Sequence, residues 1–382
     1  MLLEKIVFWA SALLLAYATL GYPLLLWAWA ALRPRPIRTS RWTPKVSVVV
    51  VAHREADRIS GRLKNLLAQD YPRDRFEILV AVDGTSDATA EKARAFVPAG
   101  VKVLAHPRRR GKPAMLNDAL GQASGQVVVL TDARQRFAPG ALRALAGPLA
   151  DPRVGAVSGA LILTEDSQQG PVACGVGGYW SYEKLVRGWE SRVDSCVGAT
   201  GAIYAIRHEL YEPMPEDTIL DDVWLPMRIV RRGYRVLFEP AARACDRAAS
   251  SASEELLRKT RTLAGNFQIF ARERWLLHPF QNRLWLQTLS HKVLRLLTPA
   301  LLAGALGASL ALVSEPFYLA ASAVQLGFYL LALAGLVLRA DRKRFHWLSV
   351  PCVFCLLVWA TLVAFARFVT GRQSVTWDRA SV

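Results

Sequence analysis

Two adjacent carboxylates, Asp221 and Asp222, are the side chains in this sequence best suited to acid–base chemistry. They stand at the start of residues 218–240, where apolar positions recur at helical spacing as far as Gly233. A helix dipole and the exposed backbone N–H groups of a first turn favour a charged carboxylate at such a position. Taken alone, the pair is more simply explained as helix-capping acids. A catalytic role therefore depends on what the rest of the chain brings to them.

Other charged side chains follow segments that have the pattern of buried strands. The strand-like segments are residues 46–52, 76–82, 101–105 and 127–130. The charged residues beyond them, or in the basic turn between them, are Glu55, Asp83, Lys112, Asp132 and Arg134. Carboxylates suit the hydroxyl and N–H groups of a nucleoside or a divalent cation, and basic side chains suit a diphosphate. Each feature alone is also an ordinary turn or solvated loop, but their recurrence at successive strand ends is a strong signal for one site.

The segments between these strands have helical periodicity. They are residues 56–70, 88–96, 113–123 and 141–149. In the first of them, Ile59, Leu63 and Leu66 fall on one face. The alternation predicts an α/β fold with a Rossmann-like, mostly parallel sheet that binds ligands at the carboxyl ends of its strands. No G-x-G-x-x-G sequence follows the first strand, so nothing supports a dinucleotide-dependent dehydrogenase.

The apolar content of the chain exceeds that of a typical soluble protein. Of its 382 residues, 52% are hydrophobic. Four uncharged runs account for the excess: residues 6–32, 296–314, 316–338 and 347–366. Each approaches or exceeds the ~20 residues of a membrane span. The first run is too long for the apolar part of a signal peptide, and Arg33 stands where a cleavage site would be expected. We therefore expect a retained anchor.

The net charge of +17 is concentrated beside these apolar runs. Basic residues follow the first run at positions 33, 35, 38 and 41 and lie between the last two at 339 and 342–344. By the positive-inside rule, these loops and residues 42–295 are cytosolic, in a multi-pass protein of the cell's inner (plasma) membrane. Lipid headgroups explain the charge without nucleic acid as a partner. The side of the C-terminal tail is left open, because its basic residues oppose the strict count of spans.

Several motifs together resemble one known family. The stretch VSVVVVAHREADRISGRLKNLLAQDYPRDRFEILVAVDGTSDAT resembles the start of a family 2 glycosyltransferase of the GT-A fold. Residues 131–134 occupy that family's Asp-x-Asp position, residues 198–202 resemble the loop near the acceptor terminus, and residues 220–222 match the Thr-Glu-Asp motif. Residues 258–262 fall where the membrane synthases of cellulose, chitin, hyaluronan and poly-N-acetylglucosamine carry Gln-x-x-Arg-Trp. The resemblance covers residues 45–275.

The resemblance implies a role for each matched residue. Asp222 would be the general base that deprotonates the acceptor hydroxyl, and Asp221 would orient that base or the acceptor. The implied donor-binding residues are Ala52, Glu55, Asp83, Lys112, Asp132, Arg134, Arg258 and Arg261. Among these, Asp83 would bind the nucleobase, and Asp132 would also hold Mg²⁺ or Mn²⁺ at the diphosphate. The implied acceptor-binding residues are Gly201, Ala202 and Trp224.

Two positions depart from the family's pattern. Arg134 replaces the second carboxylate of Asp-x-Asp, although Mg²⁺ can also be held by one carboxylate together with substrate phosphates. Arg134 would then add positive charge at the diphosphate or be an ordinary surface arginine. Thr262 stands where the synthases carry the tryptophan of the acceptor platform, which leaves processive elongation open. The tryptophans that could substitute for it, or else pack in the core, are Trp180, Trp189, Trp224 and Trp275.

Residues 254–275 are amphipathic and are typical of a helix lying in the membrane interface, which would bring Arg261 to the site. A helix that covers the sheet fits the same periodicity. Four domains are predicted: an anchor and basic linker (1–41), a GT-A domain (42–250), interfacial amphipathic helices (251–292), and C-terminal transmembrane helices with a tail (293–382).

The resemblance implies an inverting sugar transfer from a nucleotide-sugar, expected to be a UDP-sugar, to a hydroxyl of a carbohydrate or lipid-linked acceptor. The expected setting is extracellular polysaccharide synthesis, with membrane lipids as partners; a second copy of the chain or a secretion partner is left open. One alternative is a non-processive transferase that adds one sugar to a lipid carrier, which Thr262 keeps open. The other is a catalytically silent membrane scaffold. Arg134 argues weakly for it, and the intact residues that argue against it are Asp83, Asp132, Asp222 and Arg261.

Overall fold

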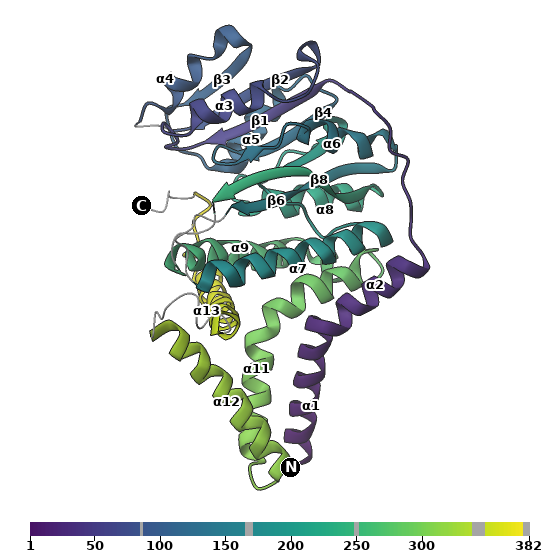
Figure 1. The fold of residues 1–382 in the computed structure, drawn as a ribbon, viewed down its shortest axis with the longest axis vertical. Helices are drawn as coiled ribbons and strands as arrows, with labels where there is room; N and C mark the ends of the chain where they lie inside the picture. The colour runs from purple at the N-terminus through teal and green to yellow at the C-terminus, as the bar shows by residue number, and fades with distance from the viewer. Residues whose placement is uncertain (85–86, 165–170, 248–251, 338–347, 377–382) are drawn as a thin grey trace. The chain divides into compact units, whose positions relative to one another are not determined.

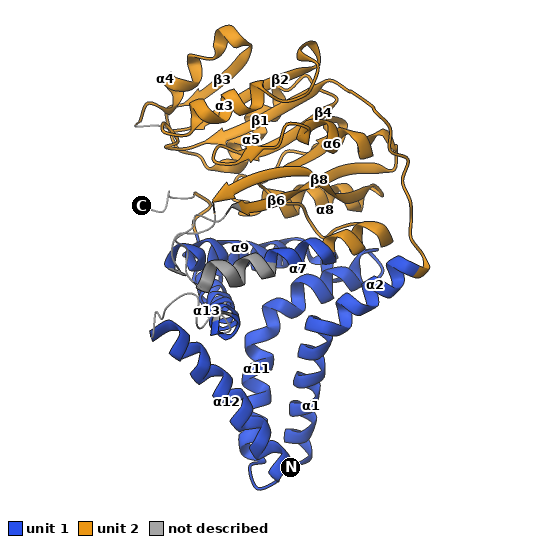
Figure 2. Cartoon of the chain, in the orientation of Figure 1, with its two compact units in different colours: residues 1–31, 165–186, 248–373 blue, residues 32–164, 187–247, 374–382 orange. Residues whose placement is uncertain are grey.

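The computed structural model describes residues 1–84, 87–164, 171–247, 252–337 and 348–376. The chain divides into two compact units (Figure 2). The sheet unit comprises residues 32–164, 187–247 and 374–382, and the helical unit comprises residues 1–31, 165–186 and 248–373. These units cut the chain at other positions than the predicted domain boundaries, which stay a prediction.

The sheet unit is built on eight strands in the order β3-β2-β1-β4-β7-β6-β8-β5 (Figure 1). Their bounds are β1 Val46–Ala52, β2 Phe76–Asp83, β3 Val101–His106, β4 Val127–Asp132, β5 Arg136–Phe137, β6 Val154–Thr164, β7 Tyr204–Arg207 and β8 Arg235–Arg247. Strands β1 to β4 pair in parallel, as do β6 and β8, whereas β7 and β5 pair antiparallel to their neighbours. The prediction of a mostly parallel α/β sheet is confirmed.

Helices alternate with the strands of the sheet unit. They are α3 Ile59–Leu67, α4 Thr89–Arg94, α5 Lys112–Gly121, α6 Ala141–Ala146 and α8 Asp221–Arg231. Every residue of β1 is buried, as expected for a strand of a parallel sheet that is covered on both faces. From α3, Ile59, Leu63 and Leu66 enter the core cluster that β1 shares. The helical periodicity read from the sequence therefore marks the face that packs.

The helical unit holds the long apolar helices. They are α1 Leu2–Ala16, α2 Tyr22–Leu32, α9 Ala252–Arg272, α10 Trp285–Gln287, α11 Leu294–Ala311, α12 Pro316–Val337 and α13 Ser349–Val369, with α7 Pro171–Val193 shared between the units. In the described part of the chain, four helical stretches are long and apolar enough to cross a membrane: Leu2–Leu32, Trp285–Ala311, Pro316–Val337 and Val350–Val369. Their lengths and composition indicate a membrane protein, as predicted.

Packing inside the helical unit joins its first helix to the hairpin α11–α12. A Cβ atom on Gly304 would lie 3.0 Å from Ser11 Oγ, so glycine permits a close approach of α11 to α1. Lys5 Nζ lies 2.7 Å from Glu315 Oε1, between α1 and the turn before α12. The N-terminus and this turn therefore lie at the same end of the helical unit.

The amphipathic helix α9 packs against α13 in the helical unit. Its Phe267 ring lies 5.3 Å from that of Phe365 and 5.9 Å from that of Phe368, measured between centroids. The structure thus gives the apolar side of α9 a helical partner. Its predicted position in the membrane interface stays a prediction.

Candidate functional site

The carboxyl ends of three neighbouring strands bring predicted site residues to one edge of the sheet unit. Asp83 ends β2, and Asp132 ends β4. Strand β1 pairs in parallel with both, so that Asp132 stands beside Val51, and Ala52 stands beside Val82. Carboxylates separated by almost fifty positions in the chain therefore meet at one edge.

Lys112, the first residue of α5, lies between the carboxylates of Asp132 and Asp221. Its Nζ lies 3.0 Å from Asp132 Oδ1 and 3.1 Å from Asp221 Oδ1. Burial alone would lower the pKa of Lys112, but Asp132, Asp221 and Asp222 together raise it above its usual value. The lysine is therefore a fixed cation at the centre of the site.

Asp221 is held on both of its carboxylate oxygens. Its Oδ1 faces Lys112, and its Oδ2 accepts a hydrogen bond of 2.9 Å from the Tyr204 hydroxyl. Burial, reinforced by the charge of Asp221, raises the pKa of Tyr204 well above its usual value, so the phenol remains a donor. Because the residue is 5% exposed and both carboxylate oxygens are engaged, Asp221 is suited to orienting its neighbours.

Asp222 is partly exposed, and the loop of residues 198–201 donates two backbone hydrogen bonds to it. The Gly201 N–H donates to Asp222 Oδ2 at 2.9 Å, and the Ala199 N–H donates to the Asp222 carbonyl at 2.7 Å. A Cβ atom on Gly201 would lie 2.9 Å from the same Oδ2, so a side chain there would displace the carboxylate. The lack of a side chain at Gly201, in the predicted acceptor loop, therefore leaves room for the Asp222 carboxylate.

Two residues that the sequence analysis did not select form hydrogen bonds with Thr200 of the same loop. The Thr200 N–H donates to Ser158 Oγ at 2.9 Å. The buried Arg187 donates from Nη1 to Thr200 Oγ1 at 2.7 Å. These contacts hold the loop from which the Gly201 N–H reaches Asp222.

Asp83 organises the basic turn that precedes Lys112. It is fully buried, and its two carboxylate oxygens accept the N–H groups of Arg110 at 2.6 Å and Gly111 at 2.9 Å. Gly84, with φ +46, passes so close to the turn that a Cβ atom would lie 2.5 Å from the Arg109 nitrogen. Asp83 thereby sets the start of α5, and its contact with a nucleobase stays a prediction.

Two further residues flank this donor-side edge. His53 Nδ1 lies 2.6 Å from the Asp83 carbonyl oxygen, which requires a proton on that nitrogen. The Glu55 N–H donates to Thr89 Oγ1 at 2.8 Å. His53 thus contacts the backbone of Asp83, and no pattern in the sequence gave a reason to select it.

Arg134 lies beside an acid that no motif marks. Its Nε is 3.0 Å from Asp246 Oδ2, and Gln135 donates to the same oxygen at 2.9 Å. Asp246 belongs to β8 and is 9% exposed. The arginine that replaces the second carboxylate of Asp-x-Asp is therefore part of an ion pair, and its effect on a diphosphate stays a prediction.

Asp132 is the predicted ligand of a divalent cation at this edge. Asp132 is one-third exposed, with Oδ1 at Lys112. In the described residues, no cluster of three or more histidine, cysteine, aspartate or glutamate side chains could hold a metal ion. The donor set fits Mg²⁺ or Mn²⁺ only where a ligand's phosphates complete the coordination.

The remaining predicted residues differ in their burial and in the unit to which they belong. Ala202 follows Gly201 in the acceptor loop, whereas the Trp224 side chain is 5% exposed with the Arg228 guanidinium 5.6 Å from its ring centroid. Burial makes Trp224 better suited to packing than to an open stacking platform. Arg258 and Arg261 belong to α9 of the helical unit, and their contact with a donor stays a prediction.

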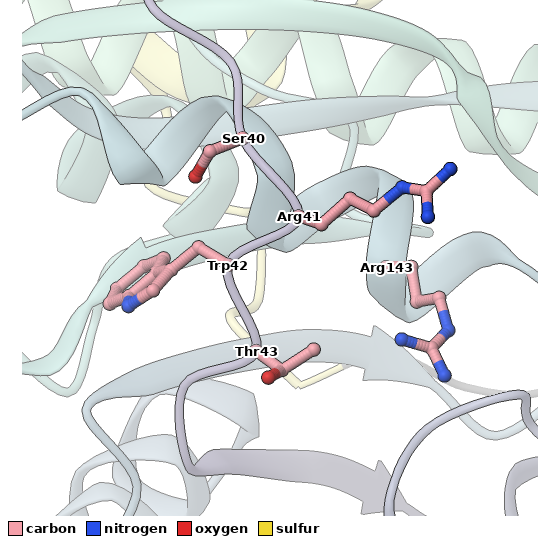
Figure 3. A pocket seen from close by; sticks show the side chains of 5 residues that line it. All are labelled: Ser40, Arg41, Trp42, Thr43 and Arg143. Atoms are coloured by element: carbon pink, nitrogen blue, oxygen red, sulfur yellow. The ribbon is translucent and has the colours of Figure 1, made fainter.

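A separate cavity of about 430 Å³ opens near the amino end of β1. It is lined by Ser40, Arg41, Trp42, Thr43 and Arg143 (Figure 3). Arg143 is paired with Asp70 at 3.0 Å. Without a carboxylate or histidine in its lining, this cavity offers no acid–base chemistry.

A mostly parallel sheet with carboxylates at the ends of neighbouring strands is the arrangement of the GT-A fold. Residues 47–212, somewhat less than half of the chain, match the sequence model of Glycosyl transferase family 2. The match begins within β1 and ends shortly after β7.

Curated relatives and a solved structure agree with this assignment. The chain is 27% identical over 243 residues to "Probable glycosyltransferase YdaM" of Bacillus subtilis (strain 168), covering 58% of this chain and 55% of that protein. It is 27% identical over 210 residues to "Poly-beta-1,6-N-acetyl-D-glucosamine synthase" of Staphylococcus aureus (strain MSSA476), covering 52% and 48%. The chain thus matches about half the length of these relatives.

The fold likeness extends over nearly the whole chain. The mannosyltransferase PcManGT from Pyrobaculum calidifontis, solved in complex with GDP-Man and Mn²⁺, superposes with a TM-score of 0.70 at 24% sequence identity. The comparison covers 96% of this chain and 99% of that one. At this identity the likeness shows the fold alone, which is the GT-A fold expected from the sequence.

Proposed function

We propose that this protein transfers a sugar, with inversion, from a nucleotide-sugar to an acceptor hydroxyl. The observation that carries the proposal is the arrangement of Lys112 between Asp132 and Asp221, with the partly exposed Asp222 next in the chain. It combines a cation for a leaving diphosphate with an adjacent base. The family 2 domain supports the same reaction class.

In this reaction Asp222 accepts the proton of the acceptor hydroxyl as its oxygen attacks the anomeric carbon. The bond from that carbon to the diphosphate oxygen breaks, and the nucleoside diphosphate leaves with the electron pair. Attack opposite the leaving group inverts the anomeric centre. A positioned base of this kind contributes typically ~10²–10⁴-fold to the rate.

Lys112 has the charge and position to stabilise the leaving diphosphate. Bound Mg²⁺ or Mn²⁺ would supply further positive charge at the phosphates, with Asp132 as its protein ligand. The Mn²⁺ in the PcManGT complex is consistent with this choice of cation. Asp221 and Tyr204 keep the lysine in place.

We infer a UDP-sugar donor and a role in extracellular polysaccharide synthesis, with the sheet unit on the cytosolic side of the inner membrane. The likeness to a poly-β-1,6-N-acetyl-D-glucosamine synthase supports this product class. The second candidate is a single transfer to a lipid carrier. It is favoured by Thr262, which stands in place of the platform tryptophan.

The two candidates differ in product length. Purified full-length protein in detergent is incubated with a panel of UDP- and GDP-sugars and Mg²⁺ or Mn²⁺, and released nucleotide and product size are measured. A long product from one donor supports the polysaccharide synthase, and a one-sugar product supports the lipid-carrier transferase. Nucleotide release that is absent with every donor contradicts the proposed reaction.

A further inference from the structure

Arg62, on α3, is a buried cation with a neutral set of contacts. Its side chain is 2% exposed. Its Nη2 donates to Thr131 Oγ1 at 2.8 Å, and its Nη1 donates to Asn65 Oδ1 at 3.0 Å. Across the described ranges of the chain, no carboxylate forms an ion pair with this guanidinium. Burying such a charge is costly for the folded state, so its retention calls for a reason.

The guanidinium remains charged at neutral pH. Burial lowers the pKa of Arg62 to about 9, while the negative charge of Asp132 acts in the opposite direction. The side chain is therefore a fixed positive charge behind the edge that carries Asp132.

Arg62 holds both ends of the loop that follows β4. At the start of the loop it bonds to the Thr131 hydroxyl, next to Asp132. At the end of the loop its guanidinium lies 4.2 Å from the ring centroid of Phe137. Asn65, its other partner, accepts the Phe137 N–H at 2.8 Å and donates to the Phe137 carbonyl at 2.9 Å. One turn of α3 thus clamps the segment that presents Asp132.

The same contact reaches the acceptor loop. The Thr131 hydroxyl, which accepts from Arg62, donates to the Ala202 carbonyl at 2.7 Å. Ala202 directly follows Gly201, whose N–H bonds to Asp222. A single guanidinium therefore fixes the end of β4 against the loop that orients the base.

We propose that Arg62 is a positioning residue, which sets Asp132 relative to the Gly201–Asp222 loop through the Thr131 hydroxyl. It reaches no substrate itself. The inference rests on the proposed function, because it assigns Asp132 to the donor. An apolar side chain of similar length would leave the core filled, but Thr131 and Phe137 would lose their common anchor.

The test uses full-length protein in detergent and the donor identified in the release assay. Arg62→Met is compared with Lys64→Met, which removes an exposed positive charge from the same helix. Thr131→Val, which removes the hydroxyl at similar volume, is compared with Thr131→Ser, which retains it. Donor KM, acceptor KM, turnover, UDP and GDP affinity, and melting temperature are measured for each variant.

Arg62→Met is expected to raise the donor KM about tenfold or more, as is usual when a supporting contact behind a binding group is lost. Acceptor KM stays within twofold, and the melting temperature is unchanged or higher, because a buried charge has been removed. Thr131→Val shows the same pattern, Thr131→Ser recovers most of the donor affinity, and Lys64→Met behaves as the wild type.

A lower melting temperature in Arg62→Met with an unchanged donor KM would assign the residue a structural role and overturn the inference. Wild-type kinetics in Arg62→Met would overturn it as well. If the wild type turns over no donor, the proposed function fails, and affinity for UDP or GDP decides the inference. Weaker binding in Arg62→Met then supports it, and equal binding, or no binding by the wild type, overturns it.

Discussion

Lys112 is the residue on which both halves of the site depend. Its ammonium pairs with Asp132 at the end of β4 and with Asp221 at the start of α8. One carboxylate oxygen of Asp221 pairs with Lys112, and the other accepts the hydrogen bond from the Tyr204 hydroxyl. The division of labour between two adjacent acids follows from their surroundings, because one is buried and bonded on both oxygens while the other is partly exposed.

Gly201→Ala tests the contact between the loop and the base. The added methyl group would lie 2.9 Å from Asp222 Oδ2 and would push the carboxylate away from its place. Turnover is expected to fall about tenfold, because the carboxylate must move by a few tenths of an ångström and a displacement near 1 Å costs about 100-fold. Melting temperature should stay near that of the wild type. Gly61→Ala, where a Cβ atom meets nothing within 4 Å, is the matched control and should leave turnover intact. Equal turnover in both variants would contradict the assigned geometry.

At the scale of secondary-structure elements, one carboxylate accepts hydrogen bonds from several segments near the amino ends of β1, β2 and β3. Glu77 on β2 accepts from Ser47 Oγ at 2.6 Å, from Ser124 N and Oγ at 2.7 Å, and from Lys102 Nζ at 2.7 Å. Burial acts to raise the pKa of Glu77, but Lys102 and the two serines outweigh it and lower the pKa to about 2. Four segments around β1 thus share one carboxylate, at the edge opposite the site.

This pairing predicts a pH-dependent contribution to stability. Because the folded-state pKa of Glu77 lies below its usual 4.5, the contribution is complete above pH 4.5 and is lost as pH falls towards 2. Glu77→Gln should therefore destabilise the protein by about 2 kcal/mol at pH 7 and by progressively less below pH 4.5. Thermal unfolding in detergent across this range measures the effect. The exposed Asp74→Asn serves as control, and a Glu77→Gln deficit that stays constant down to pH 2.5 would refute the pairing.

Local sequence patterns predicted the first half of the sheet unit and missed much of the second. Strands β1 to β4 are short apolar runs between helices, so periodicity alone locates them. Strand β8 runs from Arg235 to Arg247, because pairing with β6 carries it through Pro240 with register shifts, and no local pattern marks its full length. Helix α7 was not predicted, since its residues have no clear apolar stripe in the sequence.

The site divides in the same way. Asp83, Asp132 and Asp222 stand at element ends or in motifs, where residue type and spacing reveal them. Arg62 could not be selected from the sequence, because its partner Thr131 lies 69 positions away. Asp246 bonds to Gln135 across 111 positions. Contacts between residues that are far apart in the sequence form only in the folded chain, so no local sequence pattern predicts them.

For the molecule as a whole, the four apolar helices and the flanking basic residues predict one orientation in the membrane. The turn between α11 and α12 lies at the same end of the helical unit as Lys5, so the predicted orientation puts both on the side opposite the cytosol. A cysteine introduced at Ser314, in a background without the native cysteines, should react with an impermeant thiol reagent in intact cells. A cysteine at Lys92 should react only after permeabilisation. The reverse pattern would contradict the orientation.

The central claim is that Asp222 is the base of a sugar-transfer reaction. The most direct test measures nucleotide release and calorimetric donor binding for the wild type, Asp222→Asn and Asp221→Asn in detergent. The account predicts that Asp222→Asn binds donor as the wild type does while transfer falls by about 10²–10⁴-fold, and that Asp221→Asn loses donor affinity and melting temperature together because it disrupts Lys112. Asp222→Asn that transfers sugar at the wild-type rate, or that loses donor binding in parallel with transfer, would contradict it.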